Sequence, residues 1–240
     1  MFSRYRFHFR PVLSVAVLIA LAILLSLGNW QMQRLAWKQA LIANVEARVN
    51  MAPIPFLEAV ARARSGESME YAPVSVSGKI IPGNEALVFG TYDGAPGAYV
   101  FSGFQTNMAT VYVNQGFVPQ TILKGPGFDA TGEMDERSVV GLFRYAEEPS
   151  PPASWLKPTG RSVDGFWYIR DPQHFAELAG VETPPYYIDE LAVAGRQWPM
   201  GGTTRLQFNN RHLEYALTWF GLAATLIGVW IAFSLQKRRH

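Results

Sequence analysis

The chain has 240 residues, a formal net charge of +2 and no cysteine. Without cysteine it cannot form a disulfide, a thiolate zinc site, an iron–sulfur cluster or a thiol redox centre. Two long uncharged stretches, one near each end, distinguish it from an ordinary soluble protein.

The uncharged stretches cover residues 11–33 and 215–236. A helix rises 1.5 Å per residue, so about 20 apolar residues cross a hydrocarbon core about 30 Å thick. We therefore predict transmembrane helices over residues 11–30 and 212–235, the second including its outer rim. The first could instead be a cleaved signal peptide, since Ser26 and Gly28 suit a cleavage site. Its apolar run is, however, longer than a signal peptide usually has.

Basic residues flank both spans on the terminal side. Arg4, Arg6 and Arg10 precede the first span, three bases follow the second, and no acid lies beyond either. Because such an excess marks the cytoplasmic side, both tails, 1–10 and 236–240, are predicted to be cytoplasmic. The part between them carries about −4, so the basic pI reflects topology, and no nucleic acid partner is expected. The lack of an Arg- and Ser-rich transit peptide favours a bacterial inner membrane.

The first helix should continue beyond the membrane to about Asn50, because apolar residues keep helical spacing. Trp30 and Trp37 suit an interfacial aromatic belt, and Arg34 and Lys38 can reach lipid head groups. A short helix over 56–64 should follow and end at a Ser-Gly pair.

From Tyr71 the apolar period changes to two, which predicts strands near 74–76, 86–89, 99–104, 111–117 and 139–143. Turn-rich segments at 81–84, 93–97 and 124–127 favour antiparallel hairpins. A helix capped by Asp171, with Pro172 in its first turn, should end at Gly180 and precede a strand near 186–193. The predicted fold is an α+β membrane protein, with two transmembrane helices flanking one β-rich antiparallel periplasmic domain with short helices, residues 31–211.

No common catalytic motif is present, so we predict that the protein is not an enzyme. His174 is expected to pack or face solvent rather than act as a base. The acid pairs at 135–136, 147–148 and 189–190 are interpreted as solvated loop ends. The glycines of 90–97 predict a turn, because no helix follows them to bind a phosphate.

His212 lies directly before the second span, at its outer end. An imidazole there is a natural axial ligand for haem iron, with Arg205 or Arg211 able to meet the propionates. The alternative is an interfacial histidine that hydrogen-bonds to water and head groups, and position alone favours it.

Several blocks of residues resemble the Surfeit locus protein 1 family, assembly factors of haem–copper cytochrome c oxidase. Residues 27–38 resemble its motif at the outer end of the first span, and residues 111–119 resemble its central strand. Residues 210–223 are the most similar block and lead into the second span. Gln115 and Phe117 depart from the family's usual Arg and Trp, and Gly103 from its usual proline.

The resemblance implies a role in building oxidase subunit I, either by receiving haem A or by holding it during insertion. It makes His212 the candidate haem ligand, with Arg205, Arg211, Tyr215 and Trp219 as candidate contacts. It also suggests subunit I and haem A synthase as partners. Two alternatives remain, a scaffold for subunit I that binds no haem, and an unrelated periplasmic enzyme or sensor.

The second span carries a row of small residues at Ala224, Gly228 and Ala232. Such rows let helices approach closely, so we predict that this row packs against Ala16 and Ala20 of the first span.

Overall fold

The computed structural model describes residues 5–7, 9–125, 136–148, 160–204, 206 and 210–237. The chain divides into two compact units. The first, here called the span unit, comprises Met1–Asn44 and Gln207–His240; the second, here called the β domain, comprises Val45–Leu206.

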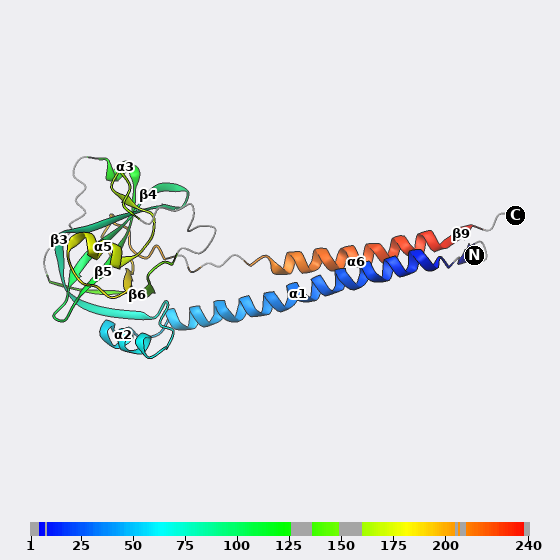
Figure 1. The fold of residues 1–240 in the computed structure, drawn as a ribbon, viewed down its shortest axis with the longest axis horizontal. Helices are drawn as coiled ribbons and strands as arrows, with labels where there is room; N and C mark the ends of the chain where they lie inside the picture. Colours follow the sequence, from blue (N-terminus) through cyan, green and yellow to red (C-terminus); the bar gives the residue numbers. More distant parts are fainter. Residues whose placement is uncertain are drawn as a thin grey trace. The chain divides into compact units, whose positions relative to one another are not determined.

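The span unit contains the two apolar helices. Helix α1 covers Pro11–Val49, with its last turns in the β domain, and α6 covers His212–Ser234. Both are long and apolar enough to cross a membrane, and only 11% of the apolar window of each is buried. Such exposure suits helices that face lipid rather than the core of a soluble protein. Figure 1 shows them alongside each other. The predicted extension of the first helix to about residue 50 is confirmed.

The terminal segments and several small residues join these helices. Strand β1 (Tyr5–Phe7) pairs antiparallel with β9 (Leu235–Lys237). On α1, a Cβ added to Gly28 would lie 2.5 Å from the ring of Phe220. Trp230 Nε1 donates to Ser14 Oγ at 3.2 Å. The absence of a side chain at Gly28 therefore gives Phe220 its place between the helices.

The predicted small-residue row is not this interface. Ala224, Gly228 and Ala232 are exposed, as is Ala16, and a Cβ added to Gly228 would meet nothing within 4 Å. The buried residues of α6 are Ala216, Ala223 and Ser234. Consecutive helix residues are about 100° apart. The row that starts at Ala224 is therefore turned away from the face that starts at Ala223.

The β domain is built on a mostly antiparallel sheet whose strand pairings form a closed circuit. Strand β3 pairs with β4 and also with β6, and the order β3-β4-β5-β8-β6 returns to β3, as in a barrel. Short strands β2 and β7 lie parallel to β3. The strands are β2 (Ile54–Pro55), β3 (Pro73–Tyr92), β4 (Ala95–Gln105), β5 (Thr110–Pro119), β6 (Arg137–Tyr145), β7 (Phe166–Trp167) and β8 (Tyr186–Glu190).

The hairpins β3-β4 and β4-β5 confirm the predicted antiparallel pairing. The two-residue turn at Asp93 and Gly94 has positive φ at both positions, 47° and 79°, which suits a tight hairpin. Strand β8, however, lies parallel to β5, which the sequence did not predict. A parallel pair needs a long crossover, and the chain between β5 and β8 is long enough to supply it.

The prediction that residues 81–84 form a turn between two strands is wrong. The segment lies within β3, where the register against β4 shifts between Ile80 and Glu85. Gly83 has a positive φ of 78°, and Pro82 lacks an N–H to donate, so the chain forms a bulge. The bulge buries Asn84, whose Oδ1 accepts a hydrogen bond from the Tyr112 hydroxyl.

Two short helices pack against different core clusters. Helix α2 (Phe56–Arg64) contributes Phe56 to one cluster, which includes Phe143, and α5 (Pro172–Ala179) contributes Phe175 to the other. Asp171 caps α5 by accepting from Gln173 N at 2.9 Å, as predicted. Burial of one such aromatic side chain contributes about 2–3 kcal/mol. One-turn helix α3 (Gln120–Leu123) follows β5.

Candidate functional site

His212 is the first residue of α6 and contacts a buried glutamine of α1. Its Nδ1 lies 2.8 Å from Oε1 of Gln31, whose exposed fraction is 9%. Both residues belong to the span unit. The hydrogen bond therefore joins α1 to the first residue of α6.

This hydrogen bond selects a tautomer of His212. An amide oxygen can only accept, so the contact places the imidazole proton on Nδ1. The lone pair of the neutral ring is then on Nε2. Metal-bound histidines have this arrangement, in which an acceptor holds the N–H and the other nitrogen binds the metal. The structure thus adds to His212 an orienting partner, Gln31, that the sequence analysis did not assign to the site.

The other predicted haem contacts are arranged around the first turns of α6. Arg211 forms an ion pair with Glu214 at 3.1 Å, and both side chains are largely exposed. Tyr215 is 54% exposed, and Trp219 is partly buried. The spacing of three and seven residues places Tyr215 and Trp219 on the same side of α6 as His212. Arg205 lies outside the described residues.

The predicted interfacial residues of α1 are exposed. Trp30 and Trp37 have exposed fractions of 53% and 52%, and the guanidinium carbon of Arg34 lies 4.3 Å from the centroid of the Trp37 ring. Exposed aromatic and cationic side chains suit a membrane interface. Their role there stays a prediction.

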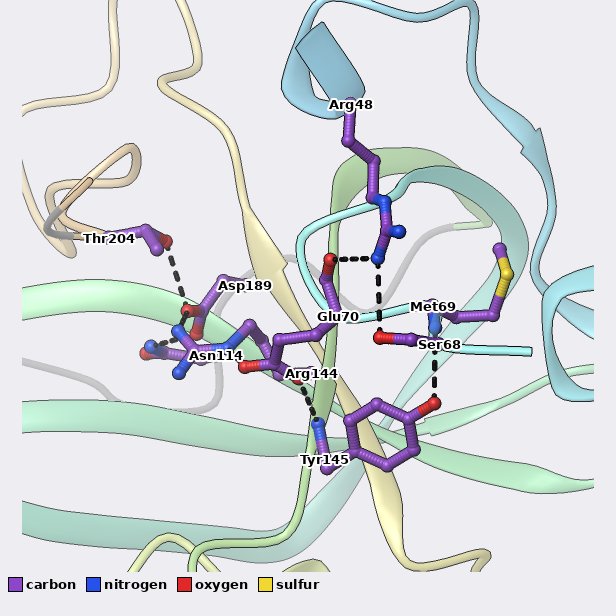
Figure 2. Close-up of polar contacts among 9 residues, drawn as sticks. All are labelled: Arg48, Ser68, Met69, Glu70, Asn114, Arg144, Tyr145, Asp189 and Thr204. Atoms are coloured by element: carbon purple, nitrogen blue, oxygen red, sulfur yellow. Dashed lines mark hydrogen bonds and ion pairs between the residues drawn. The ribbon is translucent and has the colours of Figure 1, made fainter. Parts of the chain in front are cut away.

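A second cluster of polar residues lies within the β domain, around Arg144 (Figure 2). Arg144 donates from Nη1 to Asp189 Oδ2 and from Nε to Glu70 Oε1, both at 2.8 Å. Asn114 and Thr204 also donate to the Asp189 carboxylate, at 2.7 and 2.9 Å. The cluster around the partly buried Arg144 and the Asp189 carboxylate therefore links strands β5, β6 and β8 to the segment before β3.

The acid pair at 189–190 was predicted to be a solvated loop end, and this prediction is wrong. Asp189 and Glu190 are 3% and 4% exposed and end strand β8. Glu190 pairs with Arg137 at 2.9 Å and with Arg196 at 2.8 Å. Adjacent residues of a strand point to opposite faces, so the two acids meet different arginines. Strand β8 pairs with β5 along one edge and with β6 along the other, so neither of its edges is a free loop end.

Electrostatic contacts set the charge states of this cluster. Burial alone would lower the pKa of Arg144, but interaction with Tyr187, Asp189 and Glu70 outweighs burial and raises it. Burial raises the pKa of Tyr187, and the nearby Asp189 carboxylate raises it further. Arg144 is thus held charged and Tyr187 neutral, which keeps the cation of this ion-pair network in place.

Tyr112 should make the stability of the β domain depend on pH in the alkaline range. Burial raises the pKa of Tyr112 from 10.0 to about 12. Between these values the unfolded chain loses a proton that the folded chain keeps, so stability should fall by about 1.4 kcal/mol per pH unit as pH rises. We expect Tyr112→Phe to reduce this slope in urea unfolding between pH 10 and 12. Equal slopes for both proteins would contradict this assignment.

The positions that depart from the resembled family are core residues here. Gln115 is 3% exposed and donates to Ser102 Oγ at 2.6 Å. Phe117 is 1% exposed, with its ring centroid 5.4 Å from that of Tyr99. Gly103 lies against Asn84, 2.6 Å from where its Cβ would be. In this chain these three positions contribute to packing.

His174 does not form a catalytic cluster. Its Nδ1 lies 3.0 Å from Asp171 Oδ2, and its ring stacks on Trp167 at 6.4 Å between centroids. Among the described residues no group of three or more His, Cys, Asp or Glu side chains could hold a metal ion. These contacts agree with the expectation that His174 packs at the surface.

The fold and site define a class of protein in which two apolar helices flank a β domain. In this class the second helix begins with a histidine whose Nδ1 is hydrogen-bonded to the first helix. Comparisons with known proteins identify the family. The model of the SURF1 family matches residues 18–224, and the chain belongs to this family. That range includes Gln31 and His212.

Curated relatives agree along most of the chain. The mouse protein "Surfeit locus protein 1" is 31% identical over 232 residues, which cover 89% of this chain and 73% of the mouse protein. The human protein of the same name is 33% identical, covering 85% and 71%. A "SURF1-like protein" of Caenorhabditis elegans is 26% identical, covering 91% and 72%.

Proposed function

We propose that this chain is a membrane-anchored assembly factor for haem–copper cytochrome c oxidase that handles haem A on its way to subunit I. Membership of the SURF1 family supports the general role. Haem A is the cargo in this proposal, and His212 is the residue that receives its iron. A bacterial inner membrane, with the β domain on the periplasmic side, is the proposed location.

One observation carries the haem-handling role: the 2.8 Å contact between His212 Nδ1 and Gln31 Oε1. It leaves Nε2 as the nitrogen with a lone pair, which is the nitrogen that an axial ligand needs. A histidine that only anchors a helix at an interface has no need of a buried acceptor that fixes its tautomer. Tyr215 and Trp219, on the same side of α6, supply aromatic surface for the edge of a macrocycle.

A scaffold that holds subunit I without binding haem is the second candidate. The exposed apolar surfaces of α1 and α6 favour it, because they can pack against the helices of another membrane protein. Both candidates share the partner and differ in whether the chain binds haem A.

The test is to delete the coding sequence, measure oxidase activity and haem content of membranes, and record the optical spectrum of the chain purified from haem A-producing cells. We expect oxidase activity to fall and the purified protein to show a haem A spectrum. Lower oxidase activity with a purified protein free of haem would favour the scaffold. Unchanged oxidase activity would exclude both.

A further inference from the structure

A cleft of about 550 Å³ opens on the β domain beside the Arg144 cluster. Most of its lining is polar and includes Arg144 and Arg170, and the rings of Phe89 and Tyr168 contribute an apolar part. The volume lies in the range of sites for small organic molecules and exceeds what a single inorganic ion needs.

The two guanidinium groups in the cleft differ in their contacts. Arg144 forms ion pairs with Asp189 and Glu70. The side chain of Arg170 makes no ion pair or hydrogen bond within the described part of the chain, and its guanidinium carbon lies 4.3 Å from the centroid of the Tyr99 ring. Burial alone would lower the pKa of Arg170, but interactions with Tyr187, Asp189 and Tyr99 outweigh burial and raise it. Of these, the Asp189 carboxylate is already bonded to Arg144, Asn114 and Thr204.

The acids that line the cleft do not neutralise Arg170. Glu70 accepts from Arg144 and from Tyr145 N. Glu147 accepts from the backbone N–H of Arg170 at 3.3 Å, and forms no ion pair with its guanidinium. A partly buried guanidinium without an acceptor is costly, and a carboxylate is its best partner, because the planar fork of arginine matches two carboxylate oxygens.

The aromatic side chains beside Arg170 indicate what the uncharged part of the ligand is like. Phe89 is 42% exposed, and its ring centroid lies 5.9 Å from that of Tyr168. Exposed aromatic surface next to a cation suits a flat apolar body that carries a negative group. We propose that this cleft binds a small organic carboxylate, with Arg170 holding the carboxylate and Phe89 and Tyr168 contacting the apolar body.

The probe is 4-fluorobenzoate, titrated against the purified full-length chain in detergent and followed by ¹⁹F NMR. We expect saturable binding, with Arg170→Gln weakening it at least tenfold. Arg64→Gln removes the same charge from an exposed position of α2 and should change the affinity less than twofold. The neutral isostere 4-fluorobenzamide should bind the wild type at least tenfold more weakly than 4-fluorobenzoate.

Arg170→Lys is a second variant that is less disruptive to the fold, because it keeps a positive charge next to Tyr99. It lacks the planar guanidinium that can donate two hydrogen bonds to one carboxylate. It should bind 4-fluorobenzoate more weakly than the wild type. Equal binding by folded Arg170→Gln, equal affinity for the benzamide, or no saturable binding would each overturn the proposal. Displacement by inorganic phosphate at concentrations no higher than those of 4-fluorobenzoate would overturn the assignment to carboxylates. The experiment involves neither haem nor oxidase, so its outcome is independent of the proposed function.

Discussion

Replacing Arg144 by Met should lower the free energy of unfolding of the β domain by about 3–5 kcal/mol, because the change leaves the buried Asp189 carboxylate without its cation. Asp189 is 3% exposed, and the side chain of Glu70 is 28% exposed. Asn114 and Thr204 would still donate to Asp189, but neutral donors do not balance its charge. The expected loss is a large part of the stability of a typical domain.

The measurement is urea unfolding of the purified chain in mild detergent, followed by near-UV circular dichroism of the buried aromatic residues. Arg62→Met is the matched control, because Arg62 forms an exposed ion pair with Glu58, whose side chain is 45% exposed. That pair should contribute less than about 1 kcal/mol.

A charge-neutral variant separates electrostatics from packing. Adding Asp189→Asn and Glu70→Gln to Arg144→Met removes the uncompensated charges and keeps the shapes close. If charge is the cause, this triple variant should be more stable than Arg144→Met alone. A triple variant as unstable as Arg144→Met would show that lost packing, rather than buried charge, explains the effect.

The sequence predicted most local elements because local chemistry specifies them. The cap at Asp171, the αL residue Gly180 and the Asp93-Gly94 hairpin turn are set by a few neighbouring residues. The two apolar helices follow from length and hydropathy alone. Each of these features depends on short-range geometry, so no knowledge of the tertiary fold is needed to predict it.

Features that depend on distant partners were missed. Asp189 and Glu190 read as solvated because their arginines lie up to 53 residues away in sequence. Proline and glycine at 82–83 predicted a turn, whereas pairing on either side of them continues one strand through a bulge. One available signal was that Asp189 directly follows the apolar segment Tyr186–Ile188. Acids that follow a buried strand without a turn residue between them are better interpreted as partners of buried cations.

The candidate haem site was predictable only in part. Position at the membrane rim and the resemblance singled out His212, but nothing in the sequence joined it to Gln31, which lies 181 residues away. The sequence also did not show which side of α6 faces α1. The predicted small-residue row starts at Ala224, one residue after Ala223 of the buried face. Relative placement of helices comes from side-chain packing, which periodicity alone does not specify.

Replacing His212 by Ala should abolish binding of haem A by the purified chain, because the change removes the imidazole that would bind the iron. The fold should persist, since the change removes one partly buried hydrogen bond, at a cost of about 1 kcal/mol. The readouts are the haem spectrum of the purified protein and the oxidase activity of cells that carry the variant. Full haem content in normally inserted His212→Ala protein would exclude His212 as the ligand.

Gln31 variants then test how His212 is oriented. Gln31→Leu removes the acceptor for Nδ1–H and should weaken haem A binding about 10–100-fold, the usual effect of losing a partner of a metal-bound histidine. Gln31→Glu keeps an acceptor at the same place, so it should retain binding and strengthen donation to the iron, which would shift the haem reduction potential downward. Gln33→Leu makes the same chemical change at an exposed position of α1 and should leave the spectrum and affinity unchanged. If Gln31→Leu and Gln33→Leu bind haem A equally well, the hydrogen bond only joins the two helices and does not prepare His212 to receive iron.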